Sequence, residues 1–213
     1  MTVTIYGSPV TRAGRCLWAA EELGLDYKQV DVNMMGGEHK APEYLAINPN
    51  GKMPAMTDGD LTLFESLAIN QYLASQYGKG SLQADDAKGQ ALASQWTLWV
   101  ATECETPLLH AVLHTFGLFG FEKSADKVNE QRAALEPKLA ILNAALEGRD
   151  FLAGDRFTVA DLNVATVFQW GQTARMDWAP HSNVAAWLER CLGRPANQKV
   201  GKMVAAAMAK MNG

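Results

Sequence analysis

The stretch AMTDGDLTLFES, residues 55–66, decides the fold of the first part of the chain. Asp58-Gly59 separates two short apolar runs, and both residues tolerate the positive φ angles that a tight hairpin turn requires. Ser66 follows the second run, and its hydroxyl is suited to cap a helix that continues to Tyr77. The stretch therefore predicts a β-hairpin that leads directly into a helix.

Upstream of this hairpin the pattern alternates between strand and helix. Thr2 to Tyr6 predicts a strand, and a second strand is marked by Val30 and Val32. Between them a helix is expected from Arg12 to Gly24, because Gly24 has the character of a helix-terminating glycine. Its inward face is expected to hold Cys16, Leu17, Ala20 and Leu23. This part of the chain is predicted to be an α/β domain.

Downstream of Gly80 only helical spacing is found. Gly78-Lys79-Gly80-Ser81 has the composition of a linker, and helices are expected from about Ala84 onward. Thr158 and Asp161 have the spacing of a capping box at the start of a buried helix. We therefore expect two domains, an α/β domain over residues 1–80 and an all-α domain over residues 84–213.

Composition excludes several functional classes. The net charge of −4 argues against a nucleic-acid partner, and 48% hydrophobic residues argue against disorder. The longest stretch without a charged residue, 106–121, is too short to span a membrane, and the N-terminus does not resemble a signal peptide. Three widely spaced cysteines form no disulfide framework. A cytoplasmic protein without a membrane or nucleic-acid partner is expected.

Common catalytic motifs are absent from the sequence. It contains no phosphate-binding loop of the GxxxxGK[ST] type, no GxGxxG and no GxSxG. His110 and His114 are spaced to share one helix face, which would suit a metal ion, but they do not form an HExxH motif. We interpret them as histidines that line a pocket or an interface, and we expect neither a metal nor a cofactor.

Several motifs in series resemble one known family. They are GSPVT (7–11), LWAAEE (17–22), GEHKAPEYL (37–45), NPNGKMPA (48–55), LFESLAI (63–69) and DRFTVAD (155–161). Their order and spacing are similar to those of cytosolic glutathione S-transferases, in particular phi/theta-like, bacterial-style members. The resemblance implies a thioredoxin-like N-terminal domain that binds glutathione and a helical C-terminal domain that supplies a hydrophobic acceptor site.

Glutathione is an extended tripeptide with two carboxylates, one ammonium group and a thiol. Glu65 is a candidate partner for the ammonium group. The hydroxyl of Ser66 and the helix start beside it suit the γ-glutamyl carboxylate, because helix N-termini attract anions; a simple capping role for Ser66 is the alternative. The family pattern makes the Met53-Pro54 bond cis and leaves the Met53 backbone to pair with the cysteinyl part.

The glycine carboxylate of glutathione needs cationic partners. His39 and Lys40 are candidates, with Lys52 as a further cation. An ordinary solvated loop is an equally good interpretation of His39 and Lys40. These residues complete the expected glutathione site.

The thiol must be activated, because the thiolate is the nucleophile. Thr11 occupies the position where related members carry a catalytic serine, and its hydroxyl can donate to the thiolate. Ser8 and Tyr6 are competing hydroxyls, although Tyr6 also suits a packed strand position. Cys16 is expected to pack inward rather than to react.

The expected activity is the conjugation of glutathione, as a co-substrate, to small hydrophobic electrophiles, as in detoxification. The candidate acceptor residues are His110, His114, Phe116 and Phe119, for which ordinary helix packing is the alternative. Another glutathione-dependent reaction (peroxidase, dehalogenase or isomerase) and a non-catalytic glutathione-binding protein remain open. The family resemblance also implies a homodimer, with Leu63, Phe64 and the first long helices as candidate contacts.

Overall fold

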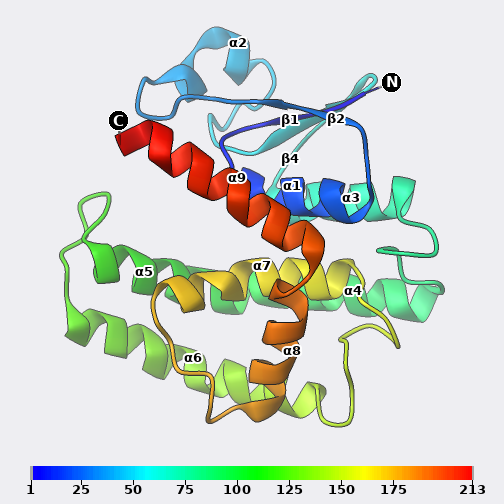
Figure 1. Ribbon diagram of the computed structural model, residues 1–213, viewed down its shortest axis with the longest axis vertical. Coiled ribbons are helices and arrows are strands. Elements are labelled where there is room, and N and C mark those ends of the chain that lie inside the picture. Colours follow the sequence, from blue (N-terminus) through cyan, green and yellow to red (C-terminus); the bar gives the residue numbers. More distant parts are fainter. Residues whose placement is uncertain (1, 213) are drawn as a thin grey trace. The chain divides into compact units, whose positions relative to one another are not determined.

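The computed structural model describes residues 2–212, and its first part is a four-stranded mixed sheet with helices (Figure 1). The strands follow the order β2-β1-β3-β4, in which β1 and β2 are parallel and the other pairs antiparallel. The elements of this part are β1 (Val3–Tyr6), α1 (Ala13–Glu22), β2 (Tyr27–Val30), a 3-10 turn η1 (Glu38–Lys40), α2 (Pro42–Leu45), β3 (Ala55–Asp58), β4 (Leu61–Phe64) and α3 (Ser66–Tyr77).

The predicted hairpin is confirmed, but its turn lies one residue further along the chain. Asp58 pairs with Leu61, so the two turn residues are Gly59 and Asp60 rather than Asp58 and Gly59. Gly59 supplies the positive φ angle, 62°. Asp58 stays in the strand because its buried carboxylate accepts hydrogen bonds from the hydroxyls of Tyr72 (2.8 Å) and Tyr77 (2.5 Å) on α3.

The end of α1 agrees with the sequence pattern. Gly24 has a φ of 61°, and the Leu25 amide donates to the carbonyl of Ala20 over 3.1 Å, which is the hydrogen bond of a glycine-terminated helix. Cys16 and Leu17 are fully buried on the inner face. The glycine therefore satisfies the last carbonyls of α1 and turns the chain toward β2.

The second strand lies earlier in the chain than predicted, because it ends at Val30 and Val32 lies outside it. The amide of Val32 donates to the Asp31 side chain over 3.1 Å instead of to a neighbouring strand. Val32 is nevertheless buried, in a small core with Tyr44 and Ala55. Val32 is therefore apolar because it packs in this core, and not because it belongs to a strand.

Two compact units emerge from the packing of the chain: residues 1–83 with 194–213, and residues 84–193. The last helix, α9 (Pro195–Asn212), packs against α1 in the first unit (Figure 1). Arg194 forms two hydrogen bonds of 2.8 Å with the Glu22 carboxylate, and Lys199 lies 2.7 Å from that of Glu21. This grouping by contacts does not test the domain ranges predicted from the sequence, 1–80 and 84–213, and those ranges stay a prediction.

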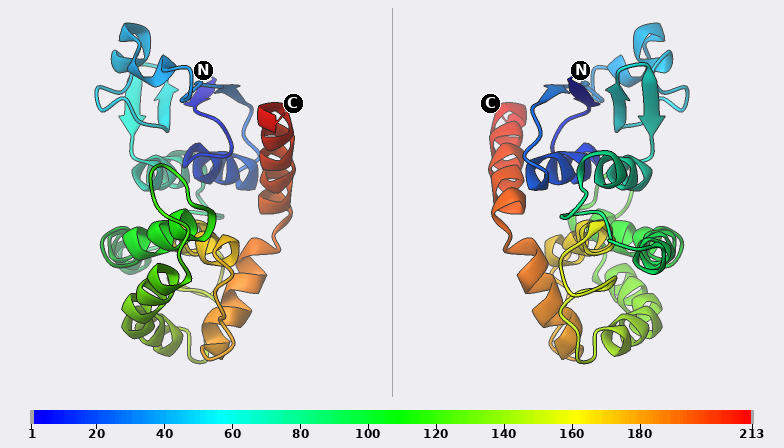
Figure 2. Two further views of the ribbon diagram at one scale, coloured as in Figure 1. Left: turned by 90° about the vertical axis from the view of Figure 1, so that its left-hand side faces the viewer. Right: turned by 90° about the vertical axis from the view of Figure 1, so that its right-hand side faces the viewer.

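The second unit consists of helices (Figure 2). Its elements are α4 (Ala87–Trp99), a π-helical turn η2 (Val100–Cys104), α5 (Glu105–Phe116), α6 (Ala125–Ala145), α7 (Val159–Thr173) and α8 (Ser182–Leu192). The predicted capping box is present at the start of α7, which is buried along nearly its whole length. This buried helix forms the centre of the unit.

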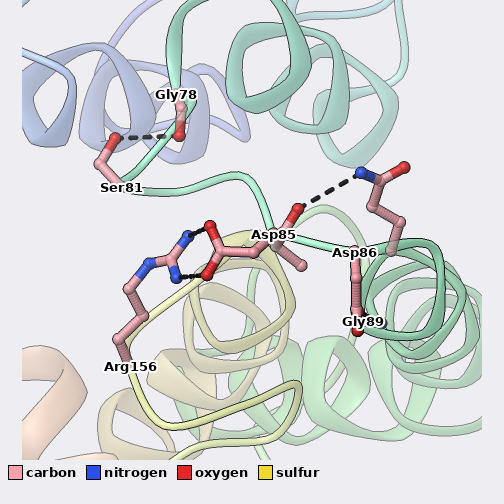
Figure 3. A network of polar contacts seen from close by, with 8 residues as sticks. Gly78, Ser81, Asp85, Asp86, Gly89 and Arg156 are labelled. Carbon is pink, nitrogen blue, oxygen red and sulfur yellow. Dashed lines mark hydrogen bonds and ion pairs between the residues drawn. The ribbon is translucent and has the colours of Figure 1, made fainter.

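Polar contacts fix the entry of the chain into α4 (Figure 3). Asp86 caps the helix by accepting a 2.7 Å hydrogen bond from the Gly89 amide. Asp85 pairs with the guanidinium of Arg156 through both carboxylate oxygens, and Arg156 precedes the capping box of α7. The pair therefore ties the beginning of α4 to the segment that leads into α7. Among residues 2–212, no helix is long and apolar enough to cross a membrane.

Candidate functional site

The turn between β1 and α1 holds two of the candidate hydroxyls, Ser8 and Thr11. Thr11 Oγ1 donates a 2.7 Å hydrogen bond to the carbonyl of Ser8, and it accepts one of 3.2 Å from the Ala13 amide. The Thr11 amide donates to the same Ser8 carbonyl over 3.0 Å. Thr11 therefore lies at the N-terminus of α1, and its hydroxyl proton is engaged within the turn.

The start of α3 differs from the capping arrangement that we predicted. Ser66 is the first residue of the helix rather than its cap, and the capping position belongs to Glu65. Glu65 has a φ of 72°, an unusual conformation for a residue other than glycine, and strained backbone of this kind is concentrated at functional sites. The exposed Glu65 side chain and the Ser66 backbone thus meet at a helix N-terminus.

The N-terminal turns of α1 and α3 lie against each other. Arg15 is buried, and its Nη1 donates to Ser66 Oγ over 3.4 Å. The thiol of Cys16 donates to the Ser66 carbonyl over 3.6 Å. Ser66 therefore lies at the positive N-terminal end of α3, in contact with the Arg15 guanidinium and with the first turns of α1. This arrangement favours the binding of an anion.

Met53 lies beside the same turn. A Cβ atom on Gly7 would lie 3.2 Å from the Cβ of Met53 and 2.8 Å from that of Ala13, so only glycine fits where β1 ends. The φ of Gly7, 132°, also favours glycine. The Met53-Pro54 bond is cis, as the resemblance implied. Met53 therefore lies beside the β1–α1 turn. The helix that starts at this turn, α1, contacts Ser66.

The three candidate cations lie on the segments that lead to Met53. Lys40 Nζ donates to the Asn50 carbonyl over 3.4 Å, and a Cβ on Gly51 would lie 2.8 Å from that nitrogen. His39 Nδ1 is buried without a hydrogen-bond partner among the described residues. Lys52 is exposed. The His39 nitrogen therefore lacks both a partner among these residues and access from solvent, whereas the Lys52 side chain is accessible.

Two positioning residues were not assigned from the sequence. The Lys52 carbonyl accepts hydrogen bonds from the Tyr44 hydroxyl (2.7 Å) and from Asn48 Nδ2 (2.6 Å). Burial raises the pKa of Tyr44 to about 12, so this hydroxyl remains a donor at neutral pH. Asn48 belongs to the NPNGKMPA motif. The spacing of residues along a sequence does not reveal, however, which side chain will contact a backbone carbonyl.

The competing residues Cys16 and Tyr6 are packed. Cys16 is fully buried, and this burial raises the pKa of its thiol far above the ordinary value, although Arg15 opposes the rise. A thiol that stays protonated is a poor nucleophile. Tyr6 packs against the core of Val32, Tyr44 and Ala55. These observations agree with an inward-packing role for both residues.

The four candidate acceptor residues lie in the helical unit, on α5 and the loop that follows it. Phe121, which the sequence analysis did not select, packs against His110 and His114, with ring centroids 5.2 and 5.1 Å apart. His114 Nδ1 also lies 2.9 Å from the Glu122 carbonyl. Phe116 and Phe119 are 49% and 71% exposed, so their aromatic surface is accessible in this unit.

Two family models match the chain. One, described as the N-terminal domain of glutathione S-transferase, covers residues 1–75, and the other, the C-terminal domain, covers residues 100–195. A probable glutathione S-transferase of Oryza sativa subsp. japonica is 36% identical over 209 residues, which are 94% of this chain and 96% of the relative. Glutathione S-transferase 3 of Zea mays is also 36% identical, over 92% of this chain and 91% of its own.

Solved structures give the same result. Glutathione S-transferase I from maize in complex with an atrazine glutathione conjugate is 31% identical and has a TM-score of 0.86, covering 96% of this chain and 99% of its own. A structure of glutathione S-transferase I with lactoylglutathione has the same TM-score and identity, over 95% and 100%. The predicted fold class, a thioredoxin-like α/β part with a helical part, is confirmed. The chain belongs to the glutathione S-transferase family.

Proposed function

We propose that this protein transfers the thiolate of glutathione to small hydrophobic electrophiles. The observation that carries the proposal is the meeting of the α1 and α3 N-termini at Ser66, with Met53 beside the same turn. Such a place suits a carboxylate next to an extended peptide backbone. The family membership and the glutathione conjugates bound by related structures support the same ligand.

Each part of glutathione has a proposed partner. The γ-glutamyl carboxylate binds the Ser66 hydroxyl and the first amides of α3, and the ammonium group pairs with the exposed Glu65 carboxylate. The cysteinyl backbone pairs with that of Met53, which cis-Pro54 follows. The ammonium group and the carboxylate on the α-carbon of the γ-glutamyl residue are thus both assigned to the start of α3.

The glycine carboxylate is assigned to the cations near Gly51. Lys40 and Lys52 contribute ammonium groups, and His39, next to Lys40, is the third candidate partner. The net charge of −4 repels an anionic tripeptide at long range, so these local charges carry the attraction. The hydrogen bonds from Tyr44 and Asn48 hold the Lys52 backbone in place.

In the proposed reaction the glutathione sulfur, as the thiolate, attacks an electrophilic carbon and forms a C–S bond. With an aryl halide the halide leaves with the electrons of the broken bond, and the thiol proton passes to solvent. Thr11 is the proposed hydroxyl donor to the thiolate, with Ser8 as the alternative. The N-terminus of α1 adds a positive field that favours the charged sulfur.

The proposed acceptor surface is the aromatic group at the end of α5. Its members are His110, His114, Phe116, Phe119 and the additional Phe121. Exposed aromatic rings bind apolar molecules by removing their surface from water. A hydrophobic electrophile is therefore the class of co-substrate that this surface fits.

Ser66→Ala is expected to weaken glutathione binding by roughly tenfold or more, because a hydrogen bond to a charged group is lost. Ser75→Ala is the matched control, since Ser75 is an exposed serine on the same helix. Retention on immobilised glutathione, with elution by free glutathione, measures the effect. Wild-type protein that is folded by circular dichroism and not retained would overturn the proposal, and equal retention of both variants would remove Ser66 from the site.

We also propose that the protein is a cytoplasmic homodimer. β4 is an edge strand of the sheet, and Phe64 on it is 39% exposed. An edge strand that presents a large apolar side chain favours association with another surface. Sedimentation equilibrium should therefore give twice the chain mass for the wild type and a shift toward monomer for Phe64→Ser; only monomer in the wild type contradicts the dimer.

One observation favours a second candidate, a glutathione-binding protein without efficient turnover. The Thr11 hydroxyl donates to the Ser8 carbonyl, and it must rotate away from this acceptor to donate to a thiolate. If the oxygen itself must also move, χ1 has to change, and the β-branch of threonine restricts χ1. Strong glutathione binding without turnover on a broad panel of electrophiles, peroxides and isomerisable substrates would support this candidate over the transferase.

A further inference from the structure

His114, near the C-terminal end of α5, has one ring nitrogen fixed by the backbone. Its Nδ1 atom lies 2.9 Å from the Glu122 carbonyl oxygen. A carbonyl oxygen accepts hydrogen bonds but cannot donate them, so Nδ1 must carry the hydrogen atom in this contact. In the neutral imidazole the other nitrogen, Nε2, then keeps its lone pair. The contact therefore selects the tautomer whose Nε2 atom accepts hydrogen bonds.

The Nε2 atom of His114 is open to a ligand. Among residues 2–212 it makes no hydrogen bond. It is also not one of the buried side-chain atoms in this part of the chain that lack a partner, so it reaches solvent. The half-buried imidazole thus presents one acceptor at the surface of the helical unit. A hydrogen-bond donor brought by a ligand can bind there.

The loop that follows α5 holds the His114 ring in place. The Gly117 amide donates to the Leu113 carbonyl over 2.8 Å, and Gly117 has a φ of 68°, which ends the helix. The Ser124 amide donates to the His114 carbonyl over 3.1 Å. Phe121 packs edge-on against the imidazole, with ring centroids 5.1 Å apart and an interplanar angle of 76°. The acceptor is therefore preorganised before a ligand arrives.

The segment that surrounds this acceptor is aromatic and carries no net charge. Phe116 and Phe119 are exposed on it, and residues 106–121 contain no charged side chain. The next two residues, Glu122 and Lys123, are exposed and of opposite charge. A charged ligand would lose hydration here without gaining a counter-charge. A neutral hydroxyl group on an aromatic ring, in contrast, supplies a donor for Nε2 and an apolar surface for the phenylalanines.

We propose that His114 gives the acceptor surface a preference for aromatic electrophiles that carry a neutral hydroxyl group. The hydroxyl donates to Nε2 of His114, and the aryl ring lies against the exposed phenylalanines of the same surface. The preference rests on the proposed transferase function, because it names the class of electrophile that the acceptor surface selects. His114 is thus a residue that determines specificity and not the group that activates the thiol.

The first test compares para-hydroxyphenethyl isothiocyanate with its para-methoxy analogue, which cannot donate a hydrogen bond. With both compounds the glutathione thiolate adds to the isothiocyanate carbon. A C–S bond forms, one bond of the C=N group opens, and the nitrogen takes a proton from solvent. We expect kcat/KM to be about fivefold higher for the hydroxy compound, as one hydrogen bond would give. Turnover of both compounds with equal kcat/KM would contradict the preference and leave the transferase proposal standing.

Variants at position 114 separate the acceptor atom from the ring. His114→Phe keeps an aromatic ring beside Phe121 but has no acceptor, so it is expected to abolish the preference. His114→Gln offers a side-chain carbonyl oxygen and is expected to restore part of it. Thr115→Val is the matched control, because the Thr115 hydroxyl donates to the Ala111 carbonyl of its own helix over 2.7 Å. Persistence of the preference in His114→Phe, or its loss in Thr115→Val, would contradict the role of His114.

A binding measurement tests the same contact without turnover. The full chain is labelled with ¹⁵N at histidine, and the His114 resonances are identified by their loss in His114→Phe. At about pH 8, above the ordinary titration range of imidazole, we expect the hydrogen on Nδ1 and a saturable shift of Nε2 with para-ethylphenol but not with para-ethylanisole. A hydrogen on Nε2, or equal shifts with both probes, would overturn the proposal. The expected shifts without turnover of either isothiocyanate would support the hydroxyaryl contact and count against the transferase proposal.

Discussion

Asp161→Ala is expected to lower the free energy of unfolding by about 4 kcal/mol, because it leaves several buried donors without an acceptor. The fully buried Asp161 carboxylate accepts hydrogen bonds from the amides of Leu152 (2.9 Å) and Thr158 (3.0 Å) and from the Trp187 indole (3.0 Å). Burial raises the pKa of Asp161, and these hydrogen bonds oppose the rise. One side chain thus joins the preceding loop, the start of α7 and the middle of α8.

Urea unfolding followed by circular dichroism measures this effect. The matched control is Asp126→Ala, since Asp126 is an exposed acid in the first turn of α6 and its loss is expected to cost about 0.5 kcal/mol. Asp161→Asn keeps one acceptor oxygen and is expected to fall between the two. A loss for Asp161→Ala that does not exceed the loss for Asp126→Ala would show that the network does not stabilise the unit.

Patterns within a few residues were predictable because their causes are local. The capping box at Thr158 and the glycine end of α1 depend on backbone geometry over three to six residues. The hairpin was equally clear, but its turn was predicted one residue early. The deciding contact, from two tyrosines of α3 to Asp58, joins residues at least 14 positions apart and is invisible in the local pattern.

The role of Ser66 in α3 was only partly predictable. A serine before an apolar helix normally serves as its cap, yet here Glu65 adopts a positive φ and takes the capping position. Contacts from Arg15 and Cys16, some 50 residues earlier in the chain, hold Ser66 inside the first turn. The same limitation explains why Phe121 was not selected, because its contacts with His110 and His114 arise from packing.

Thr11→Ala is expected to lower kcat/KM for conjugation of a chloronitrobenzene-type electrophile by roughly 100-fold, if the hydroxyl of Thr11 stabilises the thiolate. A free thiol has a pKa of about 8.5, and lowering it by about two units requires roughly 2.7 kcal/mol of preferential stabilisation of the thiolate. The donor must leave the Ser8 carbonyl to supply it. Thr11→Ser keeps the donor and removes the methyl group, so we expect activity at or above that of the wild type.

The pH profile distinguishes thiolate stabilisation from a general disturbance of the turn, since Thr11 also accepts from the Ala13 amide. Activity rises with pH as bound glutathione ionises. Loss of a donor to the thiolate raises the pKa of that thiol, so the midpoint for Thr11→Ala should move to higher pH by about one to two units. Ser8→Ala, in the same turn, should leave the midpoint unchanged. If the midpoint moves for Ser8→Ala and stays for Thr11→Ala, the activating hydroxyl is that of Ser8.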